Sequence, residues 1–181
     1  MGDANNDGLL DIFTAYGWFP TDPEHDLAQP DSLHLQSVDG SFTDVAPVWG
    51  LDDTGWARGA ILVDLDGDGW LDLVRRRVHD LPTVHLARCG SNGWLKVDLR
   101  GTSANTHAIG ALVELEADGR VQTRQVLAGG HSIASSAPPI VHFGLGAAQQ
   151  IDRVTVRWPD GAVSELGPVD TNQHIRLTRS D

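Results

Sequence analysis

Two stretches of this sequence place oxygen-bearing side chains at alternate positions beside glycine. The first reads DANNDGLLD at residues 3–11, and the second reads DLDGDGWLD at residues 64–72. Alternate side chains in a tight loop can converge on one point, where carboxylates repel one another unless a counter-charge is present. A divalent cation removes that repulsion. Ca²⁺ accepts several oxygen ligands in a flexible cage, whereas Mg²⁺ requires a stricter octahedron, so the spacing predicts two Ca²⁺ sites.

The predicted ligands take the same positions in both copies, which we call loop 1 (residues 3–11) and loop 2 (residues 64–72). Gly8 and Gly69 stand at a sharp turn that glycine makes at low cost, and the backbone carbonyl of the next residue is the expected further ligand. The predicted ligand sets are Asp3, Asn5, Asp7, Leu9 and Asp11 in loop 1, and Asp64, Asp66, Asp68, Trp70 and Asp72 in loop 2. Asp and Gly are also common in turns that bind nothing, but the repetition of one nine-residue pattern favours metal binding.

The residues around these loops predict strands rather than helices. An EF-hand requires a bidentate Glu at loop position twelve, between two helices, whereas Thr14 and Arg75 stand at that position here. The run AILV precedes loop 2 and the run WLDLV ends it, and both are short and rich in β-branched residues or leucine, as strands are. A strand–calcium loop–strand hairpin of this kind resembles the FG-GAP (VCBS-type) repeat found in β-propellers.

The composition indicates a folded, acidic protein. The 181 residues are 40% hydrophobic and carry a net charge of −12, most of it in residues 1–90. An acidic surface argues against nucleic acid or an anionic membrane as partner, and no apolar run reaches the ~20 residues of a transmembrane helix. No signal peptide is visible, and the single Cys89 excludes an intrachain disulfide. The basic run at residues 75–77 is interpreted as a solvated strand end.

Residues 1–88 predict about one and a half blades of a β-propeller. Strands are expected at 12–19, on both sides of an Asp-Gly turn within 32–46, and at 83–89. The two loops begin 61 residues apart, at positions 3 and 64, which fits one four-stranded blade with an insertion. Because propellers usually need several blades to close, we expect that the chain is part of a longer protein, or that its open edges are covered by its second half or by another copy.

Residues 92–181 predict a second domain, which follows a boundary at 89–95. Short segments alternate in strand fashion and are punctuated by Asp118-Gly119 and Asp160-Gly161, a pattern typical of a β-sandwich. The segments that resemble the ASPIC/UnbV domain are residues 101–115, 126–138, 141–146 (VHFGLG) and 154–161 (VTVRWPDG). FG-GAP repeats that run into this domain are the architecture of the cartilage acidic protein family and its bacterial relatives.

The resemblance implies an all-β chain, with a partial propeller followed by a β-sandwich-like domain. It also implies an exported or extracellular, calcium-dependent adhesion or interaction module without enzymatic activity, whose protein or glycan ligand binds at the blade loops. One loop departs from the family, which tends to have arginine and glycine after the asparagine where this chain has Thr106, His107 and Ala108. Anything that this loop binds in relatives would be bound differently here.

An enzyme, or an accessory domain of one, is the alternative interpretation. The candidate side chains are His107, His131, Ser132, Ser135, Ser136, His142 and Asp152. A serine hydrolase needs a positioned nucleophile, base and acid, and the G-x-S-x-G motif is absent from the sequence. The spacing of the three histidines matches no compact zinc motif, so we favour the binding module.

The six tryptophans suggest a sugar-binding hypothesis, since aromatic faces can stack on sugar rings. Trp70 and Trp158 are expected to pack structurally. Trp18, Trp49 and Trp56 fall in or near predicted loops and are the better candidates for an exposed ligand face.

Overall fold

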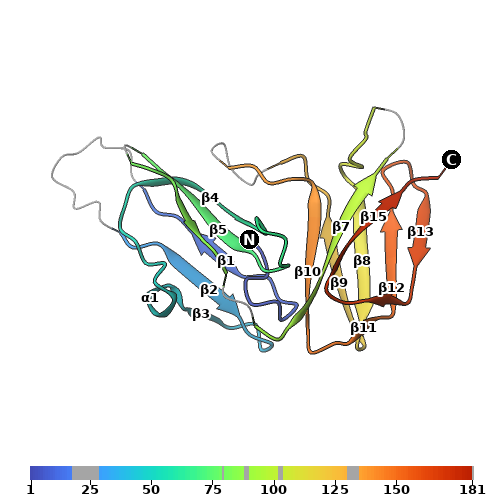
Figure 1. Ribbon diagram of the computed structural model, residues 1–181, viewed down its shortest axis with the longest axis horizontal. Coiled ribbons are helices and arrows are strands. Elements are labelled where there is room, and N and C mark those ends of the chain that lie inside the picture. The colour runs from blue at the N-terminus through green and yellow to red at the C-terminus, as the bar shows by residue number, and fades with distance from the viewer. Residues whose placement is uncertain (18–28, 79, 88–89, 102–103, 130–134, 181) are drawn as a thin grey trace.

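The computed structural model describes residues 1–17, 29–78, 80–87, 90–101, 104–129 and 135–180 (Figure 1). These residues form an all-β fold, as predicted. Their strands pair in five small sheets, and the helix α1 (Ala46–Trp49) has only four residues. No helix in these ranges is both long enough and apolar enough to cross a membrane. The predicted domain boundary falls partly outside the described residues, so the bounds 1–88 and 92–181 stay a prediction.

Two antiparallel three-stranded sheets make up the N-terminal region, residues 1–87. In the first sheet β2 (Ser32–Gln36) lies between β1 (Ile12–Thr14) and β3 (Phe42–Asp44). In the second sheet β5 (Asp72–Arg77) lies between β4 (Ala57–Val63) and β6 (Thr83–His85). Loop 1 leads into β1 and loop 2 joins β4 to β5, so each acidic loop precedes a strand as the sequence predicted. Residues 18–19 of the first predicted strand lie outside the described residues.

A small apolar core holds loop 1 against these sheets. Leu33 of β2 and Leu73 of β5 are buried in one cluster with Ala46 of α1 and Ala4 of loop 1. An antiparallel bridge between Gly2 and Asp11 closes loop 1 at its base. Because burying apolar side chains stabilises a fold in proportion to the area removed from water, loop 1 is fixed by packing as well as by hydrogen bonds.

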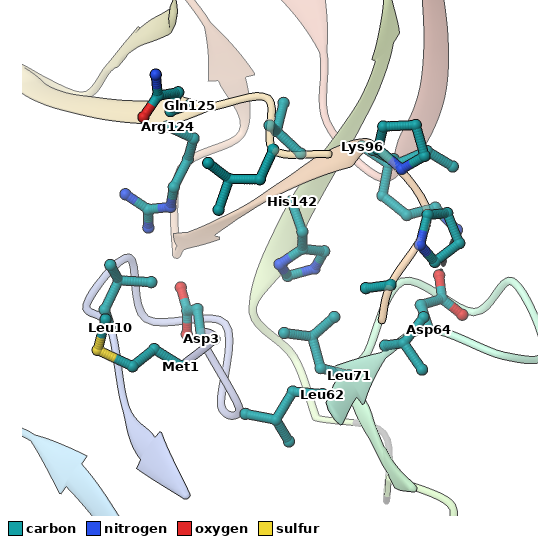
Figure 2. A pocket seen from close by; sticks show the side chains of 18 of the residues that line it. Met1, Asp3, Leu10, Leu62, Asp64, Leu71, Lys96, Arg124, Gln125 and His142 are labelled. Atoms are coloured by element: carbon teal, nitrogen blue, oxygen red, sulfur yellow. Dashed lines mark hydrogen bonds and ion pairs between the residues drawn. The ribbon is translucent and has the colours of Figure 1, made fainter. Parts of the chain in front are cut away.

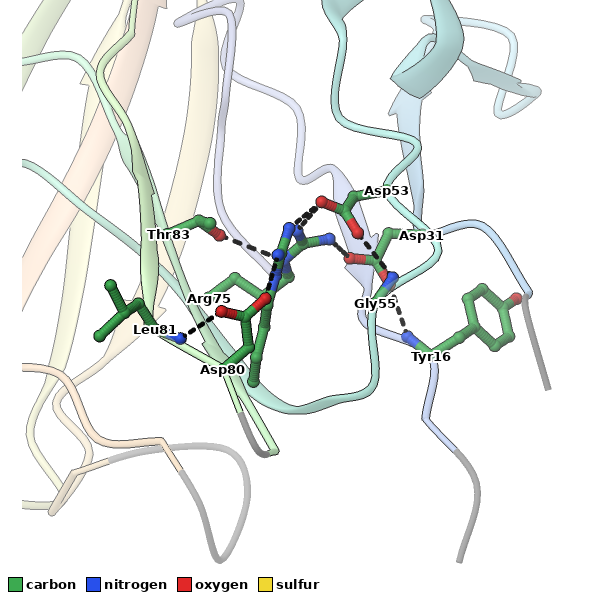
Figure 3. Close-up of polar contacts among 9 residues, drawn as sticks. Tyr16, Asp31, Asp53, Gly55, Arg75, Asp80, Leu81 and Thr83 are labelled. Carbon is green, nitrogen blue, oxygen red and sulfur yellow. Dashed lines mark hydrogen bonds and ion pairs between the residues drawn. The ribbon is translucent and has the colours of Figure 1, made fainter. Parts of the chain in front are cut away.

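The basic run at residues 75–77 is not a solvated strand end, and that interpretation was wrong for Arg75. The Arg75 side chain is 1% exposed and forms ion pairs with Asp31 and Asp53 (Figure 3). Asp31 also accepts a hydrogen bond from the Tyr16 amide, 2.7 Å away. The alternation of a central strand turns Arg75 inward and Arg76 outward, and acidic partners make the buried guanidinium tolerable.

The described part of the C-terminal region, residues 93–178, contains nine further strands. They are β7 (Gly93–Arg100), β8 (Leu112–Ala117), β9 (Arg120–Gln125), β10 (Ile140–Gly146), β11 (Gln150–Ile151), β12 (Arg153–Arg157), β13 (Val163–Leu166), β14 (Val169–Asp170) and β15 (Gln173–Thr178). One sheet has the order β10-β7-β15, in which β15 runs parallel to β7, and a second has the order β13-β12-β8-β9. Both predicted Asp-Gly turns join antiparallel neighbours, β8 to β9 and β12 to β13.

The main hydrophobic core lies between these two sheets. Alternate residues of β7 and β8 point into it, including Val97 and Val113, and Phe143 of β10 is fully buried there. Trp158 is 4% exposed, and its indole N–H donates to the Ser164 hydroxyl 2.8 Å away. The packing of one buried sheet face against another agrees with the predicted β-sandwich-like domain.

The two regions meet where the acidic loops approach β7, β9 and β10 (Figure 1). A cavity of about 360 Å³ also lies at this junction, lined by Asp3 and Asp64 from the loops and by Lys96, Arg124 and His142 from the C-terminal region (Figure 2). The contacts at this junction involve the acidic loops rather than the edge strands of the two sheets, so the expectation that the second half covers the open edges stays a prediction.

Candidate metal centres

Loop 2 brings three carboxylates together. One oxygen each of Asp64, Asp66 and Asp72 lies within 4.8 Å of the others. Asp72 is buried, while Asp66 is exposed to solvent. An ion could therefore enter from the solvent at Asp66 and bind Asp72 on the buried side of the site. Carboxylate oxygens are hard donors of the kind that Ca²⁺ prefers, and this donor set fits the predicted ion.

Backbone amides hold the carboxylates of loop 2 in place. Asp64 accepts hydrogen bonds from the amides of Gly67 and Gly69 at 2.7 and 2.9 Å. Asp68, a further predicted ligand, accepts from the Trp70 amide at 2.8 Å and is not one of the three grouped carboxylates. Gly69 has a φ of +87°, a conformation that costs glycine little. The loop is therefore wound around its own acidic side chains.

Loop 1 repeats most of these bonds at the same loop positions, although the second amide that donates to Asp3 is that of Asp7, 3.0 Å away. Asp3 accepts from the Gly8 amide at 2.7 Å, as Asp64 accepts from Gly69. Asp7 accepts from the Leu9 amide at 2.8 Å, as Asp68 accepts from Trp70. Asn5 Oδ1 accepts from the Asp7 amide at 3.1 Å. The shared nine-residue pattern thus produces one shared loop conformation.

The ninth position anchors each loop to a neighbouring strand. In loop 1 Asp11 accepts from the amides of Ala4, 2.7 Å away, and Gln36. In loop 2 Asp72 accepts from the amides of Leu65, 2.9 Å away, and Ala87. The same carboxylate therefore closes its loop and ties it to the next strand of the sheet.

The two loops differ in how their tips are covered. In loop 1 Asp3 and Asn6 are 1% and 0% exposed. In loop 2 Leu65, Asp66 and Gly67 are all exposed. Within the described residues the close grouping of three carboxylate oxygens is found in loop 2 and not in loop 1. The more open copy is therefore also the one with the better-assembled carboxylates.

The carboxyl groups at the first loop position differ in their affinity for protons. Burial raises the pKa of Asp3 to about 7, and the charges of Asp7 and Asp11 act in the same direction against the hydrogen bond from the Gly8 amide. Burial would also raise the pKa of Asp64, but the Lys96 ammonium and two loop amides outweigh it and hold that pKa below its ordinary value. A buried carboxylate without a positive charge beside it is expected to have a raised pKa, because burial disfavours the charged form.

The candidate catalytic histidines have structural partners. His142 Nε2 lies 2.9 Å from the carbonyl oxygen of Gly69, and because a carbonyl only accepts, Nε2 carries the proton. Burial lowers the pKa of His142 to about 4, so the ring is neutral near pH 7. His107 Nδ1 lies 3.0 Å from the Arg100 guanidinium. His131 and Ser132 lie outside the described residues.

The remaining enzyme candidates do not share one place with these histidines. Asp152 is exposed in the turn between β11 and β12, whereas His142 is in β10 at the junction with loop 2. Ser135 and Ser136 precede β10, and Ser136 is exposed. Among the candidates that the structure describes, Asp152 and His142 therefore lie on different elements.

The tryptophans take the roles expected of them only in part. Trp70 and Trp158 are buried, as predicted, while Trp49 is 46% exposed and Trp56 is half-buried. Trp18 lies outside the described residues. Trp94, for which the sequence suggested no role, places its indole ring against Gly69 of loop 2.

The chain matches two protein-family models. Residues 2–74 match the FG-GAP-like repeat, and residues 101–181 match the ASPIC and UnbV domain. Cartilage acidic protein 1 from Mus musculus and from Homo sapiens are each 32% identical to it over 163 residues, which is 88% of this chain and 25% and 24% of those proteins. The chain thus spans about a quarter of the length of these curated relatives.

Proposed function

This chain belongs to the family in which FG-GAP-like repeats are joined to an ASPIC and UnbV domain, and we propose that it is a calcium-binding, non-enzymatic interaction module. The grouping of Asp64, Asp66 and Asp72 oxygens within 4.8 Å carries this proposal. Three such carboxylates around one point are electrostatically unfavourable unless a cation accompanies them. The repeated hydrogen-bond pattern supports a second, weaker site in loop 1.

The residues that would hold the ions are the predicted sets. In loop 2 they are the side chains of Asp64, Asp66, Asp68 and Asp72 with the backbone carbonyl of Trp70, and in loop 1 those of Asp3, Asn5, Asp7 and Asp11 with the carbonyl of Leu9. A bound Ca²⁺ would supply positive charge to both loops, in addition to the Lys96 ammonium that pairs with Asp64 of loop 2. The loops themselves contribute the turn at glycine and the amide bonds that hold the carboxylates in place.

An interaction role outside the cytosol is part of the proposal. Millimolar calcium suits sites of the weak affinity found in extracellular modules, so we propose an exported or extracellular location. The partner would be a protein or glycan that binds at the blade loops, where Trp49 is exposed. The net charge of −12 disfavours nucleic acid. The position of His142, with Nε2 turned to a backbone carbonyl, supports a structural role for that ring over a catalytic one.

Calcium titration followed by thermal unfolding tests this function. We expect Ca²⁺ to bind with measurable heat. At about 100 times its Kd, binding to one site stabilises the folded state by about 2.7 kcal/mol, which should raise the melting temperature by roughly 5–10 °C. Asp66→Ala should remove the loop 2 share of that increase, because Asp66 is an exposed ligand with little role in folding. The matched control is Asp152→Ala, an exposed aspartate outside both loops. Absence of both heat and stabilisation in the unsubstituted chain would contradict the proposal.

A further inference from the structure

Loop 2 is in contact with the C-terminal region through its backbone and its first ligand. The Gly69 carbonyl accepts a hydrogen bond from His142 Nε2 of β10 at 2.9 Å. Asp64 forms an ion pair with Lys96 of β7, and Figure 2 shows Lys96 and His142 approaching the loop from that side. The Trp94 ring covers Gly69 so closely that a Cβ there would lie 1.8 Å from it. The absence of a side chain at Gly69 is therefore what admits β7.

Loop 1 is in contact with the same strands. The Asn6 carbonyl accepts from the Gly146 amide at the end of β10, 2.7 Å away, and the Asn5 carbonyl accepts from Asn92 Nδ2 at 2.8 Å. Gly144 of β10 lies against this loop, since a Cβ on it would come within 2.0 Å of an Asp3 carboxylate oxygen and 2.5 Å of the Asn6 Cα. A second glycine thus permits close approach, this time on the C-terminal side.

The two loops also touch each other at this junction. Asn6 Nδ2 of loop 1 donates to the Gly69 carbonyl of loop 2 at 3.1 Å, the same oxygen that faces His142. Asn6 is fully buried and has a φ of 58°, an uncommon conformation for a residue other than glycine. One carbonyl oxygen therefore joins loop 1, loop 2 and β10.

We propose that the two acidic loops together form the surface against which the C-terminal region packs. Cation occupancy of the loops then determines how stably β7 and β10 pack against them. This inference rests on the proposed calcium binding. The hydrogen bonds described above are accepted by backbone carbonyls within the loops, and the positions of these carbonyls depend on the conformation of the loop. An ion that fixes the winding of a loop fixes those acceptors as well, so binding energy at the ligands is transmitted to the junction.

The coupling must act in both directions. If a bound ion stabilises the packing of β7 and β10 against the loops, then this packing must increase the affinity for the ion by the same factor. A substitution in β10 that pushes loop 1 away must therefore weaken calcium binding. Gly144→Ala is such a substitution, since its methyl group would meet the Asp3 carboxylate and the backbone of Asn6 in loop 1. Gly93→Ala in β7 is the matched control, because its Cβ would find ordinary contacts of 3.4 Å or more.

The first experiment is hydrogen exchange of the unsubstituted chain in excess Ca²⁺ and in chelator, read separately for the loop amides and for β7 and β10. We expect Ca²⁺ to slow exchange in the loops and also in β7 and β10. Slower exchange confined to the loops would overturn this inference and leave the proposed calcium binding intact. No calcium-dependent change anywhere, together with no binding heat, would overturn both. This measurement needs no variant and so does not depend on whether a substituted chain folds.

Calcium affinity of the two glycine variants then tests the reverse direction. Gly144→Ala should bind Ca²⁺ at loop 1 about fivefold or more weakly than the unsubstituted chain, in the range of ordinary coupling between sites. Gly93→Ala should bind as the unsubstituted chain does. Equal calcium affinities of folded Gly144→Ala and Gly93→Ala would contradict the proposed coupling between calcium binding and the packing of β10 on loop 1.

Discussion

Loops 1 and 2 have one backbone pattern in two different environments. In both loops the carboxylates at positions one, five and nine accept hydrogen bonds from the amides at positions six, seven and two, respectively. Loop 1 is enclosed, and burial raises the pKa of Asp3 to about 7. Loop 2 has an exposed tip, and Lys96 helps to hold the pKa of Asp64 below its ordinary value. The sequence pattern thus determines loop conformation, while the surroundings determine how readily each carboxylate ionises.

The largest effect is expected at the sixth loop position, where the two glycines have almost the same φ. Gly69→Ala should cost roughly 3–5 kcal/mol of unfolding free energy, because positive φ and a collision with the Trp94 ring add together. Gly8→Ala should cost only about 1–2 kcal/mol, because its Cβ would meet the ends of the Gln122 and Arg120 side chains at 3.1 Å or more, and these can move. Urea denaturation in chelator measures both.

Gly67→Ala is the control for that pair of variants. Gly67 has a φ of +85°, and nothing lies within 4 Å of its Cβ position, so this variant isolates the cost of positive φ at about 1–2 kcal/mol. If Gly69→Ala were no more damaging than Gly67→Ala, the close approach of Trp94 to loop 2 would not contribute to stability.

The next effect concerns the pH dependence of calcium binding. Asp3 must lose its proton to ligate an ion, and its pKa of about 7 means that affinity at loop 1 is present above pH 7 and is lost as the pH falls through that value. We expect a roughly tenfold loss between about pH 7.5 and pH 6. Asp64 stays ionised over this range because its pKa is lowered, so loop 2 should show little change.

Calorimetry can separate the loops if each is studied without the other. Asp66→Ala leaves loop 1 to be titrated, and Asp7→Ala leaves loop 2. Equal pH dependence in the two variants would show that the environments described above do not differentiate the sites.

The smallest effect is expected from Lys96→Met, which keeps the aliphatic stem and removes the ammonium. The pKa of Asp64 should then rise because burial is no longer offset by the ion pair, and calcium binding at loop 2 should gain part of the pH dependence of loop 1. The Lys96 and Asp64 side chains are only 12% and 2% exposed, but the amides of Gly67 and Gly69 still donate to Asp64 in the variant and limit the change. Arg100→Met is the control, since Arg100 is also in β7 but pairs with Asp98. A pH profile identical to that of the control would show that Lys96 does not influence the ionisation of Asp64.

The local structure of this chain could be read from its sequence because it is set by short-range rules. The alternate carboxylates, the glycine at position six and the apolar residues that follow predicted both loops and the strands beside them. Asp118-Gly119 and Asp160-Gly161 predicted hairpin turns for the same reason, since glycine tolerates the backbone conformation that such turns need.

The environment of the loops could not be read in that way. Lys96 lies 32 residues from Asp64 in the chain, and His142 lies 73 residues from Gly69, so no spacing rule connects them. Trp94 showed no pattern that would place it against a glycine of loop 2. The burial of Arg75 was missed because its partner Asp31 is 44 residues away, and a basic run is usually solvated.

The buried guanidinium of Arg75 limits how the repeats of this chain can be rearranged. Repeats that contact only their neighbours contribute to stability almost as separate units. Here β5 of one sheet carries a charge whose partner Asp31 stands at the entrance to β2 of the other. A transplanted β5 sheet would lose the buried partner of Arg75 and keep only the partly exposed Asp53, and a lone β2 sheet would lose the guanidinium that pairs with Asp31. The smallest unit that can be transferred to another chain is therefore the pair of sheets that contain β2 and β5.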